Sequence, residues 1–168
     1  MPTKKMLQVV PKTIVYTPTG GTAVTISDFS DAVTFSYAVE LSEINSQSAD
    51  YAIGKLVTGR SVSLKAVVNN FDLQQFTAMT SGVAADYAAA SDSMTGSANS
   101  FAVNQGLVVF TGYDTTEKKN VVITLYLASV MVSGDLSFGK DSEVKLGIQW
   151  DAMRPATGPV YKIEYSIT

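Results

Sequence analysis

The stretch GRSVSLKAVVNNFDLQQFTAM, residues 59–79, changes its structural period partway along. In its first half, small polar or charged residues alternate with four apolar ones, Val62, Leu64, Ala66 and Val68. A period of two predicts a strand with one covered face. The alternation stops at two consecutive asparagines, so we expect the strand to end there.

Beyond the asparagines, apolar residues recur at every third position, at Leu73, Phe76 and Met79. This spacing predicts a short amphipathic helix over residues 70–80. Asp72 falls in its expected first turn, and Asn69 or Asn70 is suited to cap it. The chain is therefore expected to pass directly from a strand into a helix.

Other segments resemble the strand half of this stretch. Alternation is strongest over residues 33–43 and recurs over 143–151 and 161–167, and shorter strands are predicted at 22–27 and 107–111. Trp150 shares a face with apolar neighbours, so we expect it in the core. Residues 121–132 are apolar on both sides, which predicts cover on both sides, the second from a neighbouring subunit.

These elements predict one domain over residues 1–168, of a length that buries one core. The expected fold class is mainly β, a sandwich or barrel-like pair of antiparallel sheets flanked by one short helix. Extended arms are expected at 1–20 and 152–168, although either can be a strand, at an edge or bulge in the first case because of Pro11. A long inter-strand loop is expected at 45–59 and an Ala/Ser-rich loop at 80–105.

Composition argues against an enzyme. The chain has no His and no Cys, which removes the usual general base, the commonest metal ligands and a thiolate nucleophile. Its net charge is −3, so no global field attracts nucleic acid, and charged residues make up only 16% of the chain. We expect part of so weakly charged a surface to be covered by partners. No signal peptide or membrane-spanning segment is predicted, so synthesis in the cytoplasm is expected.

Three groups of residues are candidate sites. Asp28 and Asp31 are acids of the calcium-ligand type, but turn and cap chemistry explains them better. A glycosidase-like acid pair would draw on Asp135, Asp141 and Glu143, which sit in and beside turns. A carbohydrate-binding module would need exposed aromatic residues, for which the candidates are Tyr51, Tyr87 and Tyr113. We predict no catalytic residue, no metal and no cofactor.

The polar faces of the two long strands favour assembly. They carry mostly small neutral residues, as a smooth wall would; the candidate wall residues are Thr34, Ser36, Glu40, Ser42, Ser61, Ser63 and Lys65. A long strand with an open edge is a template for another chain, and proteins normally blunt such edges unless pairing is intended. If these faces surround a cavity, Glu40 and Lys65 set its potential.

Three segments together resemble the major tail tube proteins of long-tailed bacteriophages. They are the long strand VTFSYAVELSEI, the strand-to-helix stretch quoted above, and the late strand KDSEVKLGIQWDAM. The resemblance implies a β-sandwich with a flanking helix, whose copies form hexameric rings that stack into a hollow tube for DNA passage. It also implies location in the virion tail, self-association, contacts with tape measure and tail-end proteins, and no specific DNA binding.

By position, the resemblance assigns residues 33–43 and 60–68, with parts of 121–132 and 143–151, to an inner barrel. It assigns residues 45–59 to contacts between rings, and the candidate inter-subunit residues are Asp50, Tyr51, Lys55 and Arg60. The segment 80–105 is longer than the family pattern needs. Alternative interpretations are another structural part of a phage or injection machine, such as a tail-completion ring, contractile tube or capsid decoration protein, and a carbohydrate-binding β-sandwich module.

Overall fold

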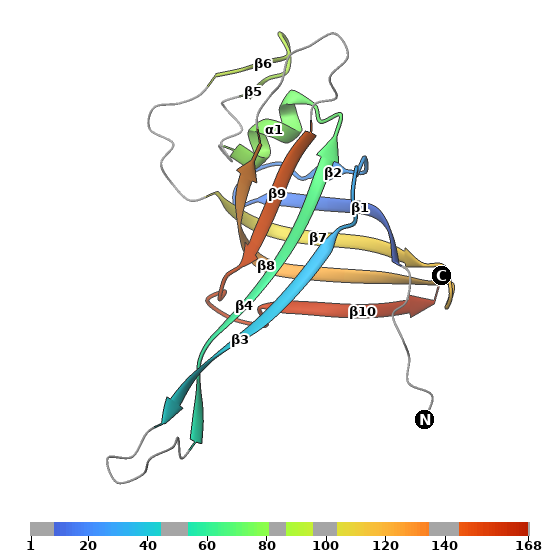
Figure 1. The fold of residues 1–168 in the computed structure, drawn as a ribbon. Coiled ribbons are helices and arrows are strands. Elements are labelled where there is room, and N and C mark those ends of the chain that lie inside the picture. The colour runs from blue at the N-terminus through green and yellow to red at the C-terminus, as the bar shows by residue number, and fades with distance from the viewer. Residues whose placement is uncertain (1–8, 45–53, 81–86, 96–103, 135–144, 168) are drawn as a thin grey trace.

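Ten strands and one helix make up the described part of the chain (Figure 1). The computed structural model describes residues 9–44, 54–80, 87–95, 104–134 and 145–167. The elements are β1 (Val9–Pro18), β2 (Val24–Ile26), β3 (Thr34–Ile44), β4 (Gly54–Asn69), α1 (Leu73–Thr80), β5 (Tyr87–Ala88), β6 (Ser93–Met94), β7 (Gln105–Asp114), β8 (Lys119–Ser133), β9 (Lys145–Ala152) and β10 (Tyr161–Ile167). The predicted mainly β fold with a single short helix is confirmed.

Eight of the strands form one antiparallel sheet with the order β2-β1-β7-β8-β9-β4-β3, and β10 pairs with β8. The sheet folds over on itself into two layers whose strands cross steeply (Figure 1). The first layer contains β2, β1, β7, the first half of β8, and β10. The second layer contains the end of β8, β9, β4 and β3.

The long strand β8 belongs to both layers. Its first half pairs with β7 on one side and with β10 on the other, whereas residues 128–133 pair with β9. Between these halves the register with β7 shifts, so Gly106 pairs with Ala128 but Val108 pairs with Leu125. A bulge of this kind bends a strand and increases its twist. The bulge therefore explains how one strand turns the corner between the layers.

The core lies between the layers and is closed at one end by α1. As the alternation predicts, the buried residues of β4 are Val62, Leu64, Ala66 and Val68. From β9, Leu146, Ile148 and Trp150 enter the same core, and Trp150 has no exposed surface. On β8 the buried side is Val121, Ile123, Leu125 and Ala128, while the alternate residues Val122 and Thr124 are half-buried.

The helix begins later than predicted. It starts at Leu73, and Asp72 rather than an asparagine caps it: Asp72 Oδ1 accepts a hydrogen bond from the Gln75 N–H at 2.6 Å, and Gln75 Oε1 accepts one from the Asp72 N–H at 3.2 Å. Asn70 adopts a left-handed conformation with φ of 45° and donates to Asp28 instead. Residues 70–72 thus make the turn that separates strand from helix, with Asn70 bonded to Asp28 and Asp72 capping the helix.

Two predicted loops are corrected, and the alternatives of arm or strand at the two ends are both resolved as strands. Residues 9–18 form a strand between β7 and β2, with the predicted irregularity beside Pro11, where the register shifts before Thr13. The predicted loop over 45–59 is too long, because Gly54 to Gly59 belong to β4; residues 45–53 lie outside the described part. Within 80–105, β5 and β6 form a small hairpin, and β7 begins at Gln105. At the other end, residues 161–167 form a strand, as their alternation predicts.

A buried carboxylate ties β10 to the β7–β8 hairpin. Asp114 is fully buried and accepts hydrogen bonds from the Tyr165 hydroxyl and from the Thr116 and Glu117 N–H groups. The Tyr165 bond is the main cause that lowers the pKa of Asp114, and the same bond raises the pKa of Tyr165 to about 12. The pair therefore holds the Asp114 carboxylate charged and the Tyr165 phenol neutral.

In the residues that the structure describes, no helix is both long enough and apolar enough to cross a membrane.

Candidate assembly surfaces

The outward face of the second layer carries most of the residues predicted to form a wall. Thr34 lies opposite Lys65, and Ser36 lies opposite Ser63. Strand alternation places these pairs on the side away from the core, because the intervening Phe35–Leu64 pair faces inward. Ser61 and Glu40 continue the same side, and we call this surface the polar face.

Glu40 lies over a glycine on the polar face. It pairs with Gly59, and a Cβ added to Gly59 would meet Glu40 Oε2 at 2.6 Å. The missing side chain thus leaves room for the carboxylate to fold across the neighbouring strand. Just beyond, the register shifts between Glu40 and Leu41, and Ser42 follows opposite Leu56. Ser42 is therefore separated from the other predicted residues by a bulge.

Sequence reasoning missed the part of the polar face that β9 and β8 supply. Ser63 pairs with Asp151 and Lys65 with Gln149, and these continue across to β8 at Ser129 and Met131. The alternation of β9 could have predicted that Gln149 and Asp151 lie on the polar face. The sequence of β8 gives no such indication. Its bulge changes the side to which the following residues point, and the bulge lies inside an apolar run in which alternation cannot be seen.

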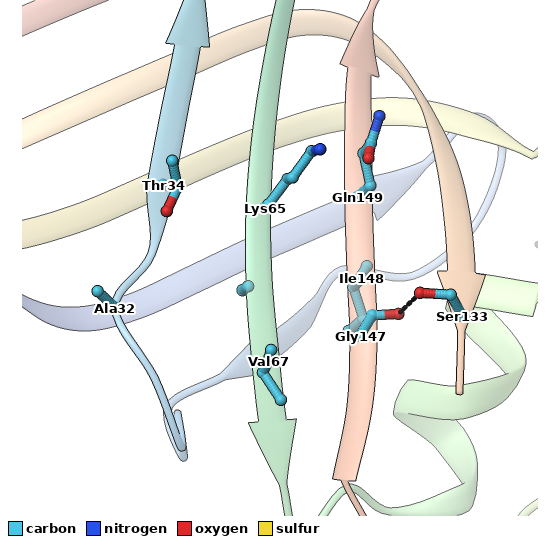
Figure 2. Close-up of a pocket in the computed structure, with 9 residues that line it drawn as sticks. Ala32, Thr34, Lys65, Val67, Ser133, Gly147, Ile148 and Gln149 are labelled. Carbon is cyan, nitrogen blue, oxygen red and sulfur yellow. Dashed lines mark hydrogen bonds between the residues drawn. The ribbon is translucent and has the colours of Figure 1, made fainter. Parts of the chain in front are cut away.

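A hollow of about 330 Å³ lies on the polar face between β3, β4, β9 and the end of β8 (Figure 2). Lys65 extends toward Gln149 within it, and Ser133 Oγ donates to the Gly147 carbonyl at 3.4 Å. Gln149 Nε2 donates to Asp151 Oδ1 at 2.7 Å, which engages one of its two N–H donors. The hollow is therefore a shallow polar depression with one cation.

The charges on the polar face balance. Glu40 and Asp151 supply two negative charges, and Lys65 and Lys145 supply two positive ones; Lys145 follows the alternation of Gly147 and Gln149 on β9. For the described residues the face is therefore close to neutral. A neutral face of small side chains offers little to hold a phosphate backbone, since phosphate binding depends on unbalanced Lys and Arg.

The far end of the β3–β4 hairpin extends beyond the body, at the lower left of Figure 1. We call residues 37–44 and 54–61 the distal ribbon. Its large apolar side chains are exposed, although residues of this type usually lie in a core: they are Tyr37, Val39, Leu41, Ile44, Leu56 and Val57. Leu41 and Val57 lie directly opposite each other, so apolar surface is continuous across the two strands.

Both edges of the distal ribbon are open in the described part of the chain. β3 pairs only with β4, and β9 pairs with β4 only from Ser63 onward. The ribbon is thus a two-stranded sheet without a third strand. Such a hairpin is at best marginally stable in water unless a further strand or another surface supports it.

The predicted inter-subunit residues fall in or beside this ribbon. Lys55 is exposed opposite Glu43, and Arg60 is exposed opposite Val39. Arg60 was expected at the start of a strand, but it lies inside β4, because the strand begins at Gly54. Asp50 and Tyr51 lie outside the described residues.

Two residues of the alternative calcium and carbohydrate sites, Asp28 and Tyr113, make ordinary structural contacts. The Asp28 carboxylate accepts from Asn70, and its carbonyl accepts from the Asn69 N–H. Tyr113 lies beneath the Lys12 ammonium, 4.7 Å from the ring centre. Asp135, Asp141, Glu143, Tyr51 and the Tyr87 side chain are not described. Among the described residues, no three His, Cys, Asp or Glu gather as a metal site would require.

Neither a protein-family model nor a curated protein matches this chain.

Proposed function

We propose that this protein is a structural subunit of a phage tail, whose copies join into stacked hexameric rings and form the hollow tube through which DNA passes. The observation that carries the proposal is the distal ribbon, with two open edges and six exposed large apolar side chains. Full burial of one such side chain contributes about 1.5–3 kcal/mol, so a partner surface stabilises the ribbon considerably.

The arrangement of the second layer supports the same proposal. The segments that the family resemblance assigns to an inner barrel, 33–43, 60–68 and parts of 121–132 and 143–151, lie side by side in that layer. Joining such layers edge to edge around a ring removes open strand edges. The polar face then lines the channel, and its balanced charges let DNA pass without binding.

The partners in this proposal are other copies of the chain, together with the tape measure and tail-end proteins of the same tail. DNA is present only in passage, and the protein works in the virion rather than as an enzyme. A different phage or injection-machine part built from the same kind of subunit would share the ribbon and the open edges. The shape of the assembly distinguishes these cases.

Electron microscopy of the concentrated protein, alone or with a tail initiator complex, tests the proposal. We expect rings or tubes with a central channel, and Glu40 facing that channel in a reconstruction. Monodisperse monomers under every condition would contradict the tube. Glu40 on the outer surface would contradict its assignment to the channel.

A charge placed on the ribbon makes the test specific. Leu41→Asp with Val57→Asp puts two carboxylates on the exposed apolar pair, so we expect the protein to remain folded and assembly to be lost. The matched control is Leu107→Asp, an exposed apolar residue on β7 in the first layer, which we expect to assemble. Equal assembly by both variants would exclude the ribbon as the contact.

A further inference from the structure

A second uncovered apolar surface lies between β3 and the first layer. It is a groove of about 230 Å³, and none of its lining residues is charged: they are Val9, Pro11, Val33, Phe35, Phe110, Val121, Ile123 and Ile163. Four strands of the first layer, β1, β7, β8 and β10, supply the floor and sides. β3 supplies the opposite side.

The groove exists because two edge strands meet there without covering each other. β3 is the edge of the second layer and β10 is an edge of the first. Tyr161 bridges them at one end, with ring centres 5.8 Å from Phe35 and 6.3 Å from Tyr37. Ile163, on the same side of β10, remains 41% exposed although it faces the core side of its strand.

The groove suits apolar side chains of a protein better than a small ligand. Ligand pockets typically enclose about 300–1,000 Å³ and present a few converging polar groups. This groove is smaller, and its lining side chains carry no polar atoms. It therefore fits one or two aliphatic side chains delivered by a protruding element.

We propose that the groove receives the distal ribbon of a second copy of this chain, with Leu56 or its neighbours entering beside Ile163. This contact rests on the proposed self-assembly and names the surfaces that meet. The ribbon has a matching shape, since it is a narrow projection with exposed apolar side chains: Leu41 and Val57 lie on one of its sides and Leu56 lies on the other. The groove is apolar and the ribbon carries exposed apolar side chains, and neither is covered by the described residues of a single copy.

The ribbon and the groove lie on different sides of the molecule, so each copy can bind one neighbour through its ribbon and another through its groove. The ribbon extends to the lower left of Figure 1, whereas the beginnings of β1 and β3, which line the groove, lie on the other side of the body. A ribbon pointing away from its own groove is placed to reach a neighbour's. Two different patches that fit each other give a head-to-tail contact, which closes into rings or continues as a filament.

Cysteine crosslinking tests this contact cleanly, because the chain contains no cysteine of its own. A disulfide requires Cα atoms within about 7 Å, so it reports the proposed pairing directly. The double variant Leu56→Cys with Ile163→Cys, oxidised in the assembled state, is expected to give a ladder of covalent oligomers on a non-reducing gel. The matched control pairs Leu56→Cys with Ser166→Cys, on the outward face of β10, and is expected to lose the ladder.

A charge in the groove gives a second readout. We expect Ile163→Glu to remain folded in urea titrations and to lose assembly, and Ser166→Glu to keep it. Rings that form without a Leu56–Ile163 ladder would overturn this contact while leaving the proposed function in place. Coupling of Ile163→Cys to Thr3→Cys within one copy would show that the N-terminal segment fills the groove instead, and would also overturn it. Failure of the parent protein to assemble at any concentration would overturn the proposed function and, with it, the contact.

Discussion

Leu64 and Leu56 lie on the same strand, β4, and meet opposite environments. Leu64 is 1% exposed and packs in the core between the two layers, whereas Leu56 is 58% exposed on the distal ribbon. Both have a β3 residue directly opposite, Phe35 for Leu64 and Ser42 for Leu56. What differs is the first layer, which covers Leu64 and which, among the described residues, does not reach the ribbon. Among the described residues, the body is thus covered from within the chain and the ribbon is not.

The comparison predicts its largest effect at Leu64. Leu64→Ala removes buried methyl groups and leaves a cavity, so we expect the free energy of unfolding to fall by about 2–5 kcal/mol. Urea denaturation of the dilute, unassembled protein measures this loss. A cost below about 0.5 kcal/mol, the range of an exposed surface substitution, would mean that the two halves of β4 do not differ as described.

The sequence predicted the body better than the ribbon, for a physical reason. Alternation at Val62, Leu64 and Ala66 marks a covered face directly, because burial follows every second residue. From Gly54 to Gly59 the sequence alternates poorly, and pairing with β3 decides that these residues are strand. That pairing joins residues far apart in the chain, so no local pattern contained it.

Two other differences have the same origin. The bulge in β8 lies inside a continuous apolar run, which looks identical whether or not its alternation shifts phase. The sequence predicted an asparagine as the helix cap, whereas the structure has Asp72. Asn70 donates instead to Asp28, which is distant in the sequence. Alternation places Thr34, Ser36, Ser63 and Lys65 on one face of the second layer, and a channel along that face remains a prediction.

A smaller effect on the body is expected at the helix that closes the core. Asp72→Ala removes the side chain that accepts the Gln75 N–H, and loss of such a cap typically costs about 1 kcal/mol. Asp31→Ala, in an exposed turn, is the matched control and is expected to change stability by less than about 0.5 kcal/mol. Thermal unfolding distinguishes them, and equal melting temperatures would contradict the capping role of Asp72.

Acid is expected to weaken the body through Asp114. Because the pKa of Asp114 is lowered in the folded protein, its contribution is present above the ordinary aspartate value of about 3.9 and is lost as the pH falls through the lowered pKa. For Tyr165, whose pKa is raised to about 12, the contribution is present below the ordinary tyrosine value of about 10 and is lost as the pH rises through 12.

Tyr165→Phe tests this dependence, since it removes the donor while keeping the ring. We expect the variant to be less stable at neutral pH and to lose less of its remaining stability between pH 5 and pH 2. Melting temperatures across that range supply the measurement. Parallel curves for the variant and the parent would show that other carboxylates carry the acid sensitivity.

The smallest effect on folding, and the sharpest test of the comparison, is expected at Leu56. Leu56→Ala removes the same atoms as Leu64→Ala from the same strand, yet no core surrounds them in a single copy, so the free energy of unfolding should change by less than about 0.5 kcal/mol. If a second copy buries this side chain, however, the association free energy loses about 1.5–3 kcal/mol. The concentration needed for assembly, measured by sedimentation, should then rise about 10–100-fold, since each 1.4 kcal/mol is a factor of ten. A variant with a large folding defect and unchanged assembly would reverse the roles given to the two leucines, because it would mean that the ribbon is supported from within its own chain.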